Sequence, residues 1–213
     1  TLALIDCPDE YWQVDLYLLG VHMKCCSSGE DERQLTANAI ANWLGDARTE
    51  GDEIDLQQDT PMIILGDMNF YSEGSQPEIT IITGDITDEK TYGPDIKGDW
   101  DESNMADPLP LDPITGNSFT LWDWKNRTDR FIVTDSVIDI GNSFILNTTT
   151  LPENELIANC LEALDTTENR TSDHLPVVVD FREPFNCEND LTNDGVIDVI
   201  DLLIVIDGWG PCP

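Results

Sequence analysis

The pattern of apolar and polar residues predicts two opening strands followed by an amphipathic helix. Apolar residues dominate 2–6 and 14–23, and the polar segment PDEYWQ between them is typical of a turn. In DERQLTANAIANWLGDAR, 31–48, the acidic residues come early, where the helix dipole favours them, and the apolar residues leave one apolar side. That side is expected to consist of Leu35, Ala39, Ala41, Trp43 and Leu44.

Further along the chain the pattern predicts a buried strand, a long loop region and then more strands. PMIILGDMN, 61–69, is an apolar run that ends in polar residues, as a buried strand does. Residues 72–118 are rich in Gly, Pro and Asp and contain one short strand candidate, at 79–82. The remaining expected elements are strands at 119–124, 129–140 and 174–181 and a helix between 152 and 164. Because strands and helices alternate without a strict βαβ rhythm, we predict a layered α/β sandwich.

The last segment, CENDLTNDGVIDVIDLLIVIDGWGPC, has a different composition from the rest of the chain. It combines an acid-rich loop, an apolar helix and a cysteine at each end. We therefore predict two domains, a larger one at 1–182 and a small loop-helix module at 183–213.

The chain of 213 residues carries a net charge of −33, which limits its partners. Such a surface repels nucleic acid and anionic membranes unless positive charge or metal is concentrated locally, so a general polyanion-coating role is excluded. A metal-assisted site for a phosphate ester is not excluded. No apolar run approaches the ~18 residues of a membrane helix, so no transmembrane segment is expected. The chain opens on the strand-like TLALIDC, so the leader of a secreted form would lie upstream.

Six cysteines show no metal-binding spacing, and their even number favours disulfides and an oxidising compartment. Buried free thiols are the alternative for Cys7 and Cys160. The cysteines are Cys7, Cys25, Cys26, Cys160, Cys187 and Cys212.

Polar groups suited to chemistry collect at the ends of predicted strands. His22 ends the second strand, and Asp67 and Asn69 end the third. A turn after a strand would alone explain Gly, Asp and Asn in ILGDMNF. However, Asp129 opens a later strand and Asp173–His174 opens the last, so both histidines of the chain occupy such positions. Taken together, these positions favour a catalytic site.

These motifs, in this order, resemble the endonuclease/exonuclease/phosphatase superfamily of metal-dependent phosphoesterases. The resemblance covers roughly residues 1–181 and implies the layered α/β sandwich of that superfamily, of which this chain looks like the second half. The motifs are GVHMK, ILGDMNF, RTDRFIV and SDHLPVVVDF.

The resemblance implies a role for each strand-end residue. Asp67 would orient or deprotonate the attacking water, and Asn69 would hold that water or a phosphate oxygen. His174 would contact the scissile phosphate, with Asp129 fixing its tautomer and favouring its charged form. Asp173, and Asp67 where it also serves as a ligand, would hold the divalent metal. His22 would bind phosphate or assist the leaving group.

Hard oxygen ligands with few histidines favour Mg²⁺ or Mn²⁺ over Zn²⁺ as that metal. A local positive charge is also expected, because half of the ten basic residues lie within a few residues of the proposed site. They are Lys24, Lys125, Arg127, Arg130 and Arg170.

One departure from the family pattern bears on activity. The first half of the family domain supplies an Asn and then a Glu, usually in a Gln-Glu pair, as the principal metal ligand, and no such segment precedes His22. We therefore expect the chain to be an N-terminally truncated domain that binds Mg²⁺ weakly and hydrolyses little or nothing alone.

The C-terminal segment matches a calcium loop with EF-hand spacing and resembles one half of a dockerin repeat. Oxygens at alternate residues converge on one Ca²⁺ while Gly195 allows the sharp turn. Thr192 stands where Asp or Asn is usual, and Asp201 stands where Glu is usual. Both replacements should weaken the affinity for Ca²⁺. The expected ligands are Asp190, Thr192, Asp194, Val196, Asp198 and Asp201.

The sequence thus predicts a secreted or cell-surface, metal-dependent phosphoesterase with a calcium-binding tail. Its substrate would be a nucleic acid or a small phosphodiester, and the tail would give it a cell-surface or cohesin-like partner. The alternative is a catalytically inactive binding or structural module of an extracellular assembly.

Overall fold

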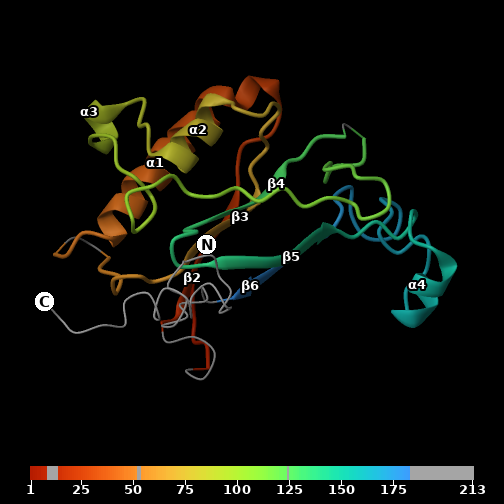
Figure 1. Cartoon of the computed structure of the whole chain (residues 1–213). Coiled ribbons are helices and arrows are strands. Elements are labelled where there is room, and N and C mark those ends of the chain that lie inside the picture. Colours follow the sequence, from red (N-terminus) through yellow and green to blue (C-terminus); the bar gives the residue numbers. More distant parts are fainter. Residues whose placement is uncertain (9–13, 52–53, 124, 183–213) are drawn as a thin grey trace, which may run out of the picture.

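The computed structural model describes residues 1–8, 14–51, 54–123 and 125–182 (Figure 1). The module expected at 183–213, with its calcium loop and two of the cysteines, lies outside these residues. The elements are β1 (Leu2–Ile5), β2 (Leu16–His22), the 3-10 helix η1 (Ser27–Gly29), α1 (Glu30–Ala47), β3 (Met62–Asp67), α2 (Gln76–Thr83), α3 (Glu89–Tyr92), β4 (Asp129–Val133), β5 (Asp139–Ile145), α4 (Glu153–Ala158) and β6 (Val177–Arg182).

The strands form a four-stranded sheet of order β1-β2-β3-β4 and a two-stranded sheet of β5 and β6. β2 and β3 are parallel, with α1 as the connection between them, and the other neighbouring pairs are antiparallel. The parallel pair therefore ends at the edge of the sheet where antiparallel β4 begins.

Successive side chains of β3 point to opposite faces of the sheet, and each face is covered by a different layer. Met62 and Ile64 pack in one core cluster with Ile40 of α1. Ile63 packs in a second cluster that includes Phe181 of β6. Figure 1 shows α1 and α2 on one side of the large sheet and β5 and β6 on the other. The predicted layered α/β architecture is confirmed.

The helix expected at 31–48 is present as α1, and the expected apolar side is confirmed at Ala41, Trp43 and Leu44 but not in the first half of the helix. Leu35 is 50% exposed and Ala39 is exposed, whereas Arg33 and Asn38 are buried. The first half of α1 lies against α2, where Gln34 bonds to Thr80. Arg33 donates to backbone carbonyls before the helix, and Asn38 bonds to Thr87. Polar side chains therefore fill two of the buried positions of α1, at Arg33 and Asn38.

The prediction of a strand at 79–82 is wrong, because these residues belong to helix α2. Pro77 lies in the first turn, where its missing N–H costs no hydrogen bond, and Gly84 follows the helix with a φ of +74°. These two end signals outweigh the β-propensity of the Ile and Thr residues between them.

The strands expected at 119–124 and 129–140 are also corrected. In the described part of 119–124 the only pairing is a single bridge between Leu121 and His174, because Thr120 and Leu121 both turn back to Asn126. The segment 129–140 divides into β4 and the start of β5 at a turn closed by a bond from Val137 to Thr134. The helix expected at 152–164 is shorter, as α4.

The four cysteines within the described residues are free thiols, so the expected disulfides are not formed among them. Cys160 is exposed and Cys7 is half-buried, so the alternative of buried thiols is wrong for Cys160. Within the described ranges, no helix combines the length and the apolar character needed to cross a membrane.

Candidate active site

Three of the predicted site residues lie side by side at one edge of the large sheet. In the register of the strands, His22 of β2 is opposite Asp67 of β3, and Asp67 is opposite Asp129 of β4. Neighbouring strands are ~4.8 Å apart, so these side chains are within reach of one another. The chain reversal that makes β4 antiparallel is what brings the start of one strand to the ends of two others.

The backbone before and after Asp67 has two unusual conformations. Gly66 has a φ of +128°, and a Cβ there would lie 2.0 Å from the carbonyl oxygen of Val21. Asn69 has a φ of +50°. Only glycine fits the first position, and asparagine is among the residues that best tolerate the second. These conformations turn the chain so that Asp67 and Asn69 face each other.

Asn69 holds the Asp67 carboxylate at both oxygens. Its backbone N–H donates to Oδ1 and its side-chain Nδ2 donates to Oδ2, each at 2.9 Å. Nδ2 also donates to the carbonyl oxygen of Met23 at 3.1 Å. Because a carbonyl only accepts, this contact fixes the orientation of the amide. Asn69 therefore orients Asp67 and has only its oxygen left for a ligand.

His174 lies between the two aspartates. Its Nδ1 is 2.7 Å from Oδ2 of Asp129, and its Nε2 is 3.8 Å from Oδ2 of Asp67. Since a carboxylate only accepts, Nδ1 carries the proton and Nε2 faces Asp67. His22 Nε2 is 3.5 Å from the same oxygen of Asp67, with 77% of its side chain exposed. The five residues His22, Asp67, Asn69, Asp129 and His174 are here called the strand-end site.

The loop 120–122 holds His174 in place. Leu175 N–H donates to the carbonyl of Thr120, and Trp122 N–H donates to that of Asp173, so both neighbours of His174 are fixed. The Thr120 hydroxyl accepts from the N–H of Asp129, and the Thr128 hydroxyl donates to the Asp129 carboxylate. The two threonines were not predicted; for Thr128, the only signal was its position beside Asp129.

The environment shifts the pKa of both central groups upward. Burial is the main reason that the pKa of Asp67 is raised, and the charge of Asp129 adds to it, against the hydrogen bond from Asn69. Burial lowers the pKa of His174, but the hydrogen bond and charge of Asp129 and the charge of Asp67 outweigh it and raise that pKa. Asp67 is thus a stronger base than a free aspartate, and His174 holds its proton more tightly.

Asp173 is adjacent to this group but is not joined to it by an ion pair among the described residues. Its side chain is exposed, and its charge contributes to raising the pKa of His174. Across the described ranges, no three His, Cys, Asp or Glu side chains come together as a group that could hold a metal. Because the Asp129 carboxylate is bonded to His174, the carboxylates left to bind a metal are Asp67 in the strand-end site and Asp173 beside it.

Two arginines expected to attract phosphate are instead buried in ion pairs. Arg127 Nη2 and Arg130 Nη1 each lie 2.5 Å from Oδ2 of Asp107, and Arg130 also pairs with Glu78 and Glu73. The side chains of Arg127 and Arg130 are 6% and 1% exposed. Burial raises the pKa of Asp107 to about 7, against the charge of Arg130. These five residues, here called the charged cluster, support the start of β4.

Arg170 is also engaged, in exposed pairs with Glu162 and Asp165. Lys24 and Lys125 are exposed. The expected concentration of five positive charges at the site is therefore wrong, because three of them are neutralised by neighbouring acids.

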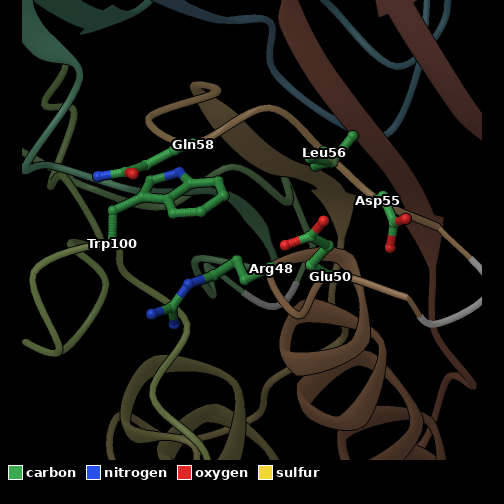
Figure 2. Close-up of a pocket in the computed structure, with 6 residues that line it drawn as sticks. All are labelled: Arg48, Glu50, Asp55, Leu56, Gln58 and Trp100. Atoms are coloured by element: carbon green, nitrogen blue, oxygen red, sulfur yellow. The ribbon is translucent and has the colours of Figure 1, made fainter.

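A separate hollow of about 400 Å³ lies away from the strand-end site (Figure 2). Arg48 lies over the ring of Trp100 there, and its guanidinium is bound to Glu102 and to the carbonyl of Lys97. None of the predicted site residues belongs to its lining, which is Arg48, Glu50, Asp55, Leu56, Gln58 and Trp100.

No protein-family model matches the sequence, and no curated protein does. Among solved structures, the chain is similar to D. rerio TDP2 complexed with a single-strand DNA product, with 15% identity and a TM-score of 0.43. It is also similar to a D. rerio TDP2 humanized by 14 mutations, with 13% identity and a TM-score of 0.44. The alignments cover 79% and 85% of this chain but only 56% and 66% of those chains. Similarity at this level assigns no family and no activity.

Proposed function

We propose that the strand-end site hydrolyses phosphodiesters, as in the endonuclease/exonuclease/phosphatase superfamily that the sequence motifs resemble. The observation that carries the proposal is the position of His174, which bonds Asp129 through one ring nitrogen and turns the other toward Asp67. The Asp129–His174 pair provides a hydrogen-bond donor, and Asp67, which faces it, provides a base.

Asp67 would act as the base that activates water. Its burial disfavours the charged form, and proton transfer from water relieves that cost. Asn69 would keep the carboxylate in place through its two bonds, and its free amide oxygen would accept from the same water. Its amide hydrogens are already used, so Asn69 would not donate to a phosphate oxygen.

His174 would stabilise the negative charge that develops on the phosphate oxygens. With Nδ1–H held by Asp129, the protonated ring presents Nε2–H toward the substrate. His22 is exposed beside Asp67 and would donate to another phosphate oxygen or to the leaving group. Each such proton donor contributes roughly 10²–10⁴-fold to the rate.

Mg²⁺ or Mn²⁺ is the metal that we expect at this site, because its donors are carboxylate oxygens. Mg²⁺ is commonly held by one or two carboxylates, with water and substrate phosphate completing its shell, and Asp67 and Asp173 would be those carboxylates. When bound, the metal supplies Lewis acidity at the phosphate. Because Asp129 is bonded to His174 and the described residues contain no group of three such ligands, we propose that this chain binds Mg²⁺ weakly and turns over slowly by itself.

The proposed substrate class is a small phosphodiester or a short nucleic acid rather than long duplex DNA. Duplex binding depends on many lysine and arginine contacts to phosphates, and three of the five basic residues near the site are already paired with acids. With a net charge of −33, the remaining surface repels a long polyanion.

The test is hydrolysis of bis(4-nitrophenyl) phosphate in the presence of Mg²⁺ or Mn²⁺. We expect a slow, metal-dependent rate that falls about 100-fold or more in Asp67→Asn and in His174→Ala. Asp88→Asn, in the loop before α3, is the matched control and should leave the rate unchanged. If both site variants keep the wild-type rate, or metal has no effect, the proposal is wrong and the inactive binding module becomes the better account.

We also propose that the C-terminal segment binds Ca²⁺ and attaches the protein to an extracellular or cell-surface partner, cohesin-like in kind. The support is the spacing of acids in DLTNDGVIDVID. Fractionation should find the native protein in the medium or at the cell surface, and a purely cytosolic location would contradict secretion.

A further inference from the structure

Two adjacent cysteines follow β2 and stand apart from the proposed phosphodiester chemistry. Cys25 and Cys26 lie between His22, at the end of β2, and the first turn of η1. Both are exposed free thiols. Exposed thiols are rare on protein surfaces, since cysteine is among the most frequently buried residues. A pair of them on adjacent residues therefore calls for a chemical explanation.

The backbone that carries this pair is held firmly. The N–H of Cys26 donates to the hydroxyl of Tyr71 at 2.7 Å. Its carbonyl accepts from Gly29 N–H and from Nη1 of Arg33, at 3.0 and 2.9 Å. Arg33 is buried, and the same Nη1 donates to the carbonyl of Lys24 at 2.8 Å. The two thiols are thus presented to solvent from a fixed turn.

The spacing of adjacent residues disfavours a direct disulfide between these thiols. Consecutive Cα atoms are ~3.8 Å apart across a trans peptide, whereas disulfide-bonded residues usually have Cα atoms ~4.4–6.8 Å apart. An ion that bonds to both sulfurs lets them stay farther apart than an S–S bond does. The pair therefore suits a bridging ligand better than it suits oxidation.

The pKa of Cys25 depends on its neighbours, including the adjacent Cys26 thiol. The neighbouring thiol of Cys26 is the main reason that the pKa of Cys25 is raised, because a hydrogen bond to it favours the protonated form. Lys24 and Arg33 act in the opposite direction and favour a thiolate. Soft thiolate ligands select soft ions, and the oxygen-rich strand-end site selects hard ones.

We propose that Cys25 and Cys26 form a binding site for a thiophilic metalloid or soft metal ion, of which trivalent arsenic is the model. With phenylarsonous acid, two As–S bonds form and two As–OH bonds break. Each thiol proton leaves with one hydroxide as water, and arsenic keeps its oxidation state. Small dithiols close a five-membered ring with arsenic. Here the ring is larger, because it includes the peptide bond between the two residues.

The test is binding of phenylarsonous acid to the reduced full-length chain, followed by intact mass and by titration of free thiols. We expect one equivalent to bind, with loss of two free thiols, and a dithiol competitor to remove it while a monothiol does not. Cys25→Ser and Cys26→Ser should each weaken binding about 100-fold or more, because a single thiol loses the gain from joint attachment.

The control keeps the pair and removes the remaining cysteines. A chain in which Cys7, Cys160, Cys187 and Cys212 are all serine should bind as the wild type does. The proposal is overturned if this variant loses binding, or if either single replacement at Cys25 or Cys26 leaves the affinity unchanged. Hydrolysis is not part of the readout, so the result is independent of the proposed phosphodiesterase activity.

Discussion

At Gly66 the backbone of β3 approaches β2 more closely than any side chain would allow. A Cβ at this position would lie 2.0 Å from the Val21 carbonyl oxygen, and the φ of +128° is unfavourable for other residues. Asp67 comes next in the chain, so this one glycine sets both the spacing of the two strands and the direction of the central carboxylate.

Gly66→Ala should therefore destabilise the protein by about 3 kcal/mol or more, because both backbone strain and a steric clash are introduced. Gly74→Ala is the matched control. Gly74 also has a positive φ, +72°, but nothing lies within 4 Å of its added Cβ. It should cost only about 1–2 kcal/mol. Urea unfolding measures both, and equal costs would contradict the close approach at Gly66.

The pKa of His174 offers a second test at the residue scale. Asp129→Asn removes the charge that raises this pKa and leaves only an uncharged, weaker acceptor, so the His174 pKa should fall in an NMR titration. In the wild type the protonated ring stabilises the fold fully below its unfolded-state pKa, and this contribution is lost as the pH rises through the raised, folded-state pKa. Asp46→Asn in α1 should leave the titration unchanged. An unaltered His174 pKa in Asp129→Asn would refute the pairing.

At the scale of elements, the start of β4 is supported by the charged cluster. Arg130 follows Asp129 directly, lies 5.6 Å from the centre of the Phe70 ring, and bonds acids from two other segments. Phe70, whose ring Arg130 contacts, directly follows Asn69 in the chain. Arg130 thus connects the start of β4, which carries Asp129, to the segment after β3, which carries Asn69.

Arg130→Met should lower the free energy of unfolding by about 3–5 kcal/mol, because Asp107 and Glu78 would remain buried without this partner. Arg170→Met removes an arginine whose side chain is 47% exposed and should change stability by less than about 1 kcal/mol. Thermal or urea unfolding distinguishes the two. A loss at Arg130 no larger than at Arg170 would show that the cluster contributes little.

The sequence predicted the elements with clear periodicity and missed those decided by contacts distant in sequence. β2, α1 and β3 lie within two residues of their expected bounds. By contrast, Ile and Thr at 79–82 have strand propensity, and only Pro77 and Gly84 indicate the helix that forms. The strand-end residues were found because strand ends converge in space. The pairing of Arg127 and Arg130 with Asp107 was not predicted, since no local sequence pattern joins residues twenty or more positions apart.

At the scale of the whole molecule, the acidic charge and the C-terminal segment are the features that the described fold does not explain. Calcium binding by the loop at 190–201 would bring its acids together and neutralise part of their charge. Titration with Ca²⁺ should therefore increase helix content measured by circular dichroism. Asp190→Ala together with Asp201→Ala should abolish the change, and no response of the wild type up to millimolar Ca²⁺ would exclude the site.

The proposed function requires that phosphate binds at the strand-end site and not at the hollow beside Trp100. The most direct measurement follows the His174 imidazole and the Trp100 indole by NMR while dimethyl phosphate is added with Mg²⁺. We predict saturable shifts of the His174 resonances, removed by Asp67→Asn, with the Trp100 indole unaffected. Shifts at Trp100 without any at His174, or none at either, would contradict the claim.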